Sequence, residues 1–77
     1  MTRPPDVHVL TDAGRLLWKV MQGGRTLSWH LTQWTAVRLA KRVAQRDRVD
    51  LVTHAVDGRI RSKDSYGDES PRKDTEH

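Results

Sequence analysis

The sequence predicts an α+β fold: a three-stranded antiparallel meander, one helix packed on it, a further strand and a short terminal strand. Three observations support this prediction. Residues 7–30 fall into three short runs of β-branched, apolar and aromatic residues, separated by turn signals. Residues 33–46 repeat apolar side chains at spacings of three and four, the pattern of an amphipathic helix. Another β-branched run follows at 49–56, and a chain of 77 residues allows only one such domain.

The first three strands are predicted at 7–10, 16–21 and 25–30. The segment 11–14 is rich in turn-forming residues and separates the first two strands. Gly23-Gly24 separates the second and third strands, and glycine tolerates the positive φ angles that tight hairpin turns need. The three strands therefore follow one another as a meander.

Alternation along these strands assigns the side chains to two faces. The face expected beneath the helix carries Val7, Val9, Leu16, Trp18, Val20, Leu27 and Trp29. The opposite face is mixed in character and carries His8, Leu10, Leu17, Lys19, Met21, Thr26, Ser28 and His30. Three large apolar side chains, Leu10, Leu17 and Met21, lie among these polar ones. We therefore expect another segment or a partner molecule to cover this face.

Thr32 is predicted to cap the N-terminus of the helix, since its hydroxyl can accept a bond from an unpaired backbone N–H group. The apolar stripe consists of small residues, so the helix can lie close to the sheet; it contains Ala36, Val37, Ala40, Val43 and Ala44. The opposite side is strongly basic and contains Arg38, Lys41, Arg42, Gln45 and Arg46. Asp47-Arg48 is expected to end the helix.

The strand predicted at 49–56 is followed by Asp57-Gly58, a strong turn dipeptide. Arg59-Ile60-Arg61 is expected to pair back as a short terminal strand. We expect residues 1–6 to be a flexible lead-in and 7–67 to form the folded domain. Residues 68–77 contain no apolar side chain and are expected to be a disordered tail.

The composition limits the location and the chemistry of the protein. No run of about 18 apolar residues is present, which argues against a transmembrane helix. The first six residues are not followed by the apolar run of a signal peptide, so a cytoplasmic protein without a membrane partner is expected. The chain has no cysteine, which excludes disulfides and cysteine-based zinc sites.

The charge distribution suggests a nucleic-acid partner. The net charge is +4, but residues 1–67 carry 12 basic and 6 acidic groups, while residues 68–77 carry −2. A basic body attracts polyanions such as DNA or RNA, although a small domain also uses such charge for solubility. The candidate phosphate-contacting residues are Arg38, Lys41, Arg42, Arg46 and Arg48, with a second group at Arg59, Arg61 and Lys63.

The alternative is a protein-interaction module, for example a homodimer. The apolar residues Leu10, Leu17 and Met21 on the mixed sheet face are the candidate contacts. Trp34, in the first turn of the helix, could anchor a partner or simply close the end of the core.

Catalysis and metal binding have little support in the sequence. His8, His30 and His54 lie on different strands, and none shows the spacing of a common metal-binding motif. Ser28 and His30 share a strand face, but a nucleophile also needs an oxyanion hole. We therefore expect a binding module that is not an enzyme and has no catalytic residues, metal or cofactor.

The chain resembles the domain-of-unknown-function family 2188, short proteins of bacteria and phages. The resemblance covers about residues 7–67 and implies the same fold, but the family has no established activity to transfer. Thr35 and Trp34 depart from the acidic and polar residues that this family usually has there. The segments that carry the resemblance are Leu16-Leu17-Trp18-Lys19-Val20, Gly24-Arg25, Thr32-Gln33, Leu51-Val52-Thr53-His54, Asp57-Gly58-Arg59-Ile60-Arg61 and Asp64-Ser65-Tyr66-Gly67.

Overall fold

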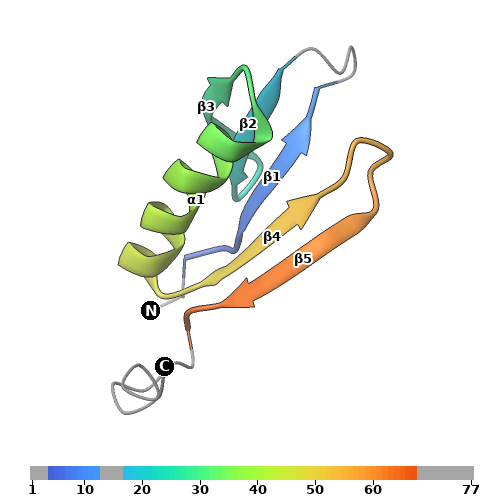
Figure 1. Ribbon diagram of the computed structural model, residues 1–77. Coiled ribbons are helices and arrows are strands. Elements are labelled where there is room, and N and C mark those ends of the chain that lie inside the picture. The colour runs from blue at the N-terminus through green and yellow to red at the C-terminus, as the bar shows by residue number, and fades with distance from the viewer. Residues whose placement is uncertain (1–3, 13–16, 68–77) are drawn as a thin grey trace.

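The computed structural model describes residues 4–12 and 17–67. These residues form one five-stranded sheet with one helix packed on one of its faces (Figure 1), which confirms the α+β prediction. The predicted tail 68–77, the first three residues of the lead-in and Leu16 lie outside the described residues. The elements in chain order are β1 (Val7–Thr11), β2 (Trp18–Gln22), β3 (Arg25–His30), α1 (Gln33–Asp47), β4 (Asp50–His54) and β5 (Ile60–Ser65).

The order of the strands in the sheet is β3-β2-β1-β4-β5. The antiparallel meander β1-β2-β3 forms one side, as predicted. After α1 the chain returns so that β4 pairs parallel to β1, and β5 then pairs antiparallel to β4. The turn at Asp57-Gly58 is present, with Gly58 at a φ of 94°. The terminal strand, expected at 59–61, extends to Ser65.

The core lies between α1 and the centre of the sheet. Ala36, Ala40 and Ala44 of the predicted apolar stripe are fully buried. They face branched side chains of β1, β2 and β4, and the buried core is completed by Val7, Val9, Val20, Val49 and Leu51. Because alanine is small, α1 approaches the sheet closely, and Trp18 and Val37 pack around the rim of this contact.

Both ends of α1 are capped by local hydrogen bonds. The Thr32 hydroxyl accepts a bond from the backbone N–H of Thr35 at 3.2 Å, which confirms the predicted cap. The Thr35 hydroxyl donates to the Thr32 carbonyl at 3.1 Å, so threonine at this position still supports the first turn. At the other end Arg48 takes the left-handed conformation, with φ 58°, and its N–H bonds to the carbonyl of Ala44.

The predicted faces of β3 are wrong from Leu27 onward, because the β2–β3 hairpin contains a β-bulge, whereas Thr26 shares the face of Met21 as expected. Gln22 pairs with Arg25 across the Gly23-Gly24 turn, but Val20 pairs with Ser28 and Lys19 with Trp29. Leu27 is therefore the extra residue, and a one-residue shift moves every later side chain to the other face. Leu27 and Trp29, expected in the core, are exposed. Ser28 and His30, expected on the opposite face, share the face of Val20 and Trp18 that α1 covers.

The segment before β1 is attached to the sheet by two hydrogen bonds. The Gln22 side-chain amide donates to the carbonyl oxygen of Pro5 at 3.1 Å. The backbone N–H of Asp50 donates to an Asp6 carboxylate oxygen, also at 3.1 Å. A Cβ atom on Gly23 would lie only 2.7 Å from Cγ of Pro5, so glycine is needed there for close approach as well as for its positive φ.

Candidate functional site

The solvent-facing side of α1 carries exposed cations. Arg38, Lys41 and Arg42 are exposed on consecutive turns. Arg46 differs from them, because its Nε donates to the Asp47 carboxylate at 3.0 Å. Hydrogen bonds from Arg46 and from Gln22 hold the pKa of Asp47 below its ordinary value, so this carboxylate is charged and offsets Arg46.

Trp34 lies on the same side of α1, next to Arg38. Its side chain remains 66% exposed, although it is the second residue of α1. The guanidinium carbon of Arg38, one turn later, lies 4.9 Å from the centre of the Trp34 ring, a cation–π contact. Arg38 therefore stacks on the indole and remains exposed to solvent.

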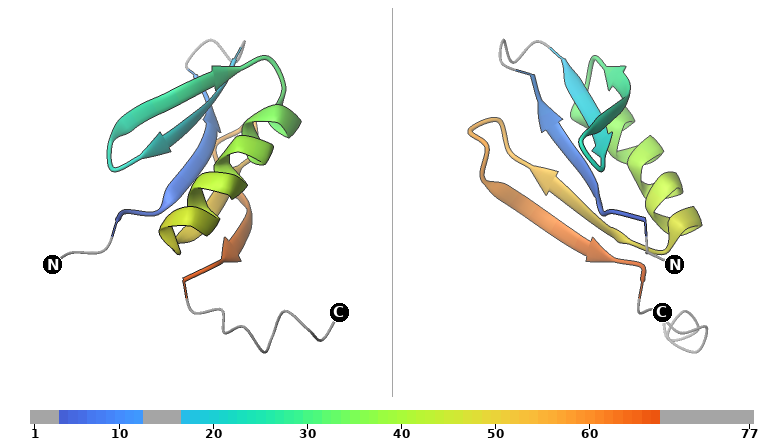
Figure 2. Two further views of the ribbon diagram at one scale, coloured as in Figure 1. Left: turned by 90° about the vertical axis from the view of Figure 1, so that its left-hand side faces the viewer. Right: turned by 180° about the vertical axis from the view of Figure 1, so that it is seen from behind.

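A groove of about 350 Å³ separates α1 from β5. It forms because α1 packs on β1 to β4, and β5 continues the sheet beyond the helix (Figure 2). Arg61 reaches across it, and its Nη1 donates to Oε1 of Gln33 at 2.6 Å. The Gln33 amide in turn donates to the carbonyl of His54 at 3.2 Å, which fixes its orientation. The groove is lined by Gln33, Trp34, Val37, Lys41, Thr53, Arg61, Ser62 and Asp64.

A smaller hollow of about 180 Å³ lies on the other flank of α1, toward β3. Arg38 and Arg42 line it together with His30, Thr35 and Leu39. The Ser28 hydroxyl lies 2.7 Å from Nε2 of His30, so the sequence-predicted pair is in contact. This pair alone does not define a catalytic centre, because acyl transfer also requires donors for the developing oxyanion.

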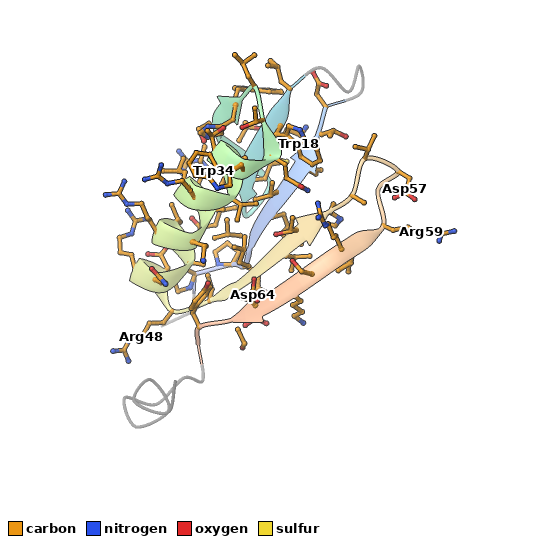
Figure 3. The ribbon with its side chains drawn as sticks, in the orientation of Figure 1. Trp18, Trp34, Arg48, Asp57, Arg59 and Asp64 are labelled. Atoms are coloured by element: carbon orange, nitrogen blue, oxygen red, sulfur yellow. The ribbon has the colours of Figure 1, made fainter. Side chains whose placement is uncertain are left out.

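The basic residues predicted to contact phosphates do not form one continuous surface in the structure. Arg61 joins Lys41 at the groove, whereas Arg59 projects from the β4–β5 turn, away from α1 (Figure 3), with its Nε 3.8 Å from an Asp57 oxygen. Lys63 lies 3.6 Å from a carboxylate oxygen of Asp50. Arg48 lies at the C-terminus of α1, apart from Trp34 (Figure 3). We therefore define the cationic patch as Arg38, Lys41, Arg42 and Arg61.

The sheet face opposite α1, the outer face, carries the other predicted partner-binding residues. Leu10 and Met21 are half-buried on it, and Leu17, just before β2, is half-buried as well. Trp29 is more exposed, at 51%, and Nζ of Lys19 lies 5.5 Å from the centre of its ring. No other described element covers this face (Figure 2).

The outer face also contains a histidine pair that the sequence did not predict. Nδ1 of His8 lies 3.1 Å from Nε2 of His54, and the two rings are stacked. Nδ1 of His54 lies 3.2 Å from the Gly58 carbonyl, so it donates there and leaves Nε2 to accept from His8. Within residues 4–12 and 17–67, no group of three or more His, Cys, Asp or Glu side chains could hold a metal ion.

The His8 ring makes the stability of the domain depend on pH. Burial and the neighbouring His54 lower the pKa of His8 below 6.5, and Asp6 opposes them with a smaller effect. The unfolded chain therefore binds a proton at this residue more readily than the folded chain, and stability is lost as the pH falls below 6.5. We expect the thermal midpoint to fall over this range and His8→Asn to flatten the dependence. A pH dependence that His8→Asn leaves unchanged would contradict this account.

The geometry defines a small α+β domain with a cationic helix side, a groove beside it and an open sheet face. The family model described as an uncharacterized protein conserved in bacteria, domain-of-unknown-function family 2188, matches residues 7–66. The chain belongs to this family, as the sequence resemblance predicted. The comparisons with curated proteins and with solved structures gave no match. No helix in the described part of the chain is long and apolar enough to cross a membrane.

Sequence reasoning missed most of the polar lining of the groove. Gln33, Ser62 and Asp64 were not candidate residues. Ser62 and Asp64 were left out because the terminal strand was expected to end at Arg61, and Gln33 was considered only as the first residue of the helix. If 60–65 had been interpreted as one strand, the alternation of side chains would have placed Ser62 and Asp64 on the same face. Thr53, the buried polar residue of the lining, pairs with Ser62 on β5.

Proposed function

We propose that this domain binds nucleic acid through the cationic patch, mainly by contacts to phosphates. The observation that carries the proposal is the grouping of Arg38, Lys41 and Arg42 on one exposed helix side, with Arg61 reaching the same side from β5. One acidic residue, Asp64, lines the groove with Lys41 and Arg61. A cytoplasmic location, where bacterial nucleic acids are accessible, is part of this proposal.

The charges elsewhere on the domain are more nearly balanced. Arg46, Arg59 and Lys63 each have a carboxylate oxygen within 4.0 Å. The cationic patch groups four of the twelve basic side chains of residues 1–67 on one side of the domain. Exposed cations that meet phosphates release condensed counterions, which supplies sequence-independent affinity.

A titration at several salt concentrations tests this proposal. Binding of a labelled oligonucleotide is followed by fluorescence anisotropy between about 50 and 200 mM salt. Four phosphate contacts predict that log affinity falls with log salt at a slope of about −3 to −4, depending on whether the nucleic acid is single- or double-stranded. Absence of binding at low salt with micromolar protein would contradict the proposal.

The outer face supports a second candidate function, a homodimer. The favouring observation is Trp29, which is 51% exposed on the edge strand β3, on a face that no described element covers. Large aromatic side chains on an open surface concentrate binding energy. Leu10 and Met21 would extend the apolar contact toward the centre of the sheet, and two copies could pack these faces around a two-fold axis.

Sedimentation tests the dimer directly. Wild-type protein should sediment as a dimer at high concentration, and Trp29→Lys should sediment as a monomer without loss of thermal stability. Lys41→Glu, on the other side of the domain, serves as the control and should leave the dimer intact. A wild-type monomer at high concentration would reject this candidate.

A further inference from the structure

We propose that the groove between α1 and β5 seats an unpaired nucleobase against Trp34, so that the domain selects single-stranded nucleic acid over duplex. This inference rests on the proposed function and deepens it by naming the form of nucleic acid and the contact that selects it. Three observations carry it: the exposure of Trp34, the polar lining of the groove, and the position of the cations around it.

Trp34 is placed as a stacking platform. Its ring is 66% exposed and also lines the groove, so it does not serve as a lid over the core. Arg38 lies over the ring at 4.9 Å from its centre and thereby limits its movement. An aromatic ring that is ordered before binding loses little conformational entropy when a base stacks on it.

The groove has the size and the chemistry for a base. Its volume of about 350 Å³ falls within the range of small-molecule sites, about 300–1,000 Å³. Val37 supplies an apolar surface, whereas Ser62 and Asp64 present a hydroxyl and a carboxylate from β5. These groups match the donors and acceptors on the edge of a base, and a carboxylate accepts well from exocyclic amino groups.

The cations continue from the groove along the helix. Lys41 and Arg61 line the groove itself, where the phosphates next to a seated base would lie. Arg38 and Arg42 line the hollow on the other flank of α1, which extends the positive surface across the helix. A basic track beside an aromatic platform is the arrangement with which proteins bind single strands.

Stacking requires an unpaired base. In a duplex both ring faces of each base are covered by its neighbours, and only the edges and the phosphates are accessible. The cationic patch can contact the phosphates of either form, but Trp34 can gain a stacking contact only from a single strand. The ratio of the two affinities therefore isolates the contribution of Trp34.

The experiment compares Trp34→Ala with Trp29→Ala, the same substitution at an exposed tryptophan on the opposite face. Affinities for a single-stranded oligonucleotide and for a duplex of the same sequence are measured by anisotropy at one salt concentration. Wild type and Trp29→Ala should prefer the single strand. Trp34→Ala should weaken single-strand binding by about tenfold to a hundredfold, leave duplex binding within about twofold, and lose the tryptophan quenching that accompanies single-strand binding.

The outcomes separate this inference from the function on which it rests. If wild type binds both forms with a strong salt dependence but Trp34→Ala leaves the ratio unchanged, the base-stacking inference is wrong and phosphate binding stands. If wild type binds neither form, both are wrong. Thermal melting of each variant confirms that its fold is intact, which the exposure of both tryptophans favours.

Discussion

Leu51→Ala is expected to lower the free energy of unfolding by about 2–5 kcal/mol, the usual cost of a large-to-small change in a core. Leu51 is fully buried in β4 and is among the largest side chains of a core made mainly of valine and alanine. Neighbours this small cannot extend into the space that a leucine leaves. For a domain of this size, the loss is a large part of the total stability.

Urea unfolding followed by circular dichroism measures this effect, and Leu31→Ala is the matched control. Leu31 is 81% exposed just before the helix cap, so its truncation should change the stability by no more than about 0.5 kcal/mol. Similar losses in the two variants would show that β4 does not pack against α1 as described.

Reversing two charges of the cationic patch is expected to have the largest effect on binding. The double variant Lys41→Glu/Arg42→Glu removes two of four phosphate contacts and adds two repulsive charges. We expect its affinity for nucleic acid at low salt to fall by about a hundredfold or more, and the salt slope to shrink by about 1.5 to 2. Because both side chains are exposed on α1, the fold should be retained.

The matched control is Arg59→Glu/Lys63→Glu, which makes the same change in net charge at two other exposed positions. Both residues lie near carboxylates, Arg59 by Asp57 and Lys63 by Asp50. Their reversal should cost less than about tenfold in affinity, through the long-range field alone. Equal losses in the two double variants would mean that net charge, rather than the cationic patch, determines binding.

The sequence predicted most of the local structure of this domain. The Thr32 cap, the alanine stripe and the Asp57-Gly58 turn are confirmed, because each depends on a few neighbouring residues. The predicted faces of β3 were wrong from Leu27 onward, for a reason that simple alternation of side chains does not show. A two-residue Gly23-Gly24 turn without a bulge would pair Trp18 with Trp29, but the bulge at Leu27 pairs Trp18 with His30.

The candidate site was predictable only in part. The exposed cations of α1 follow from helical periodicity, since they lie opposite the alanine stripe. The sequence does not show which of them have acidic neighbours, because the contact of Lys63 with Asp50 depends on strand pairing. The His8–His54 pair likewise depends on the parallel pairing of β1 with β4, because its two residues are 46 positions apart in the sequence.

The most direct test of nucleic-acid binding through the helix side is an NMR titration of the full chain with a single-stranded oligonucleotide. The account predicts that backbone amide shifts change along 33–42 and 61–64, together with the indole N–H signal of Trp34. The signals of His8, Lys19 and Trp29 on the outer face should stay in place. Shifts confined to the outer face, with the helix signals unchanged, would contradict the account.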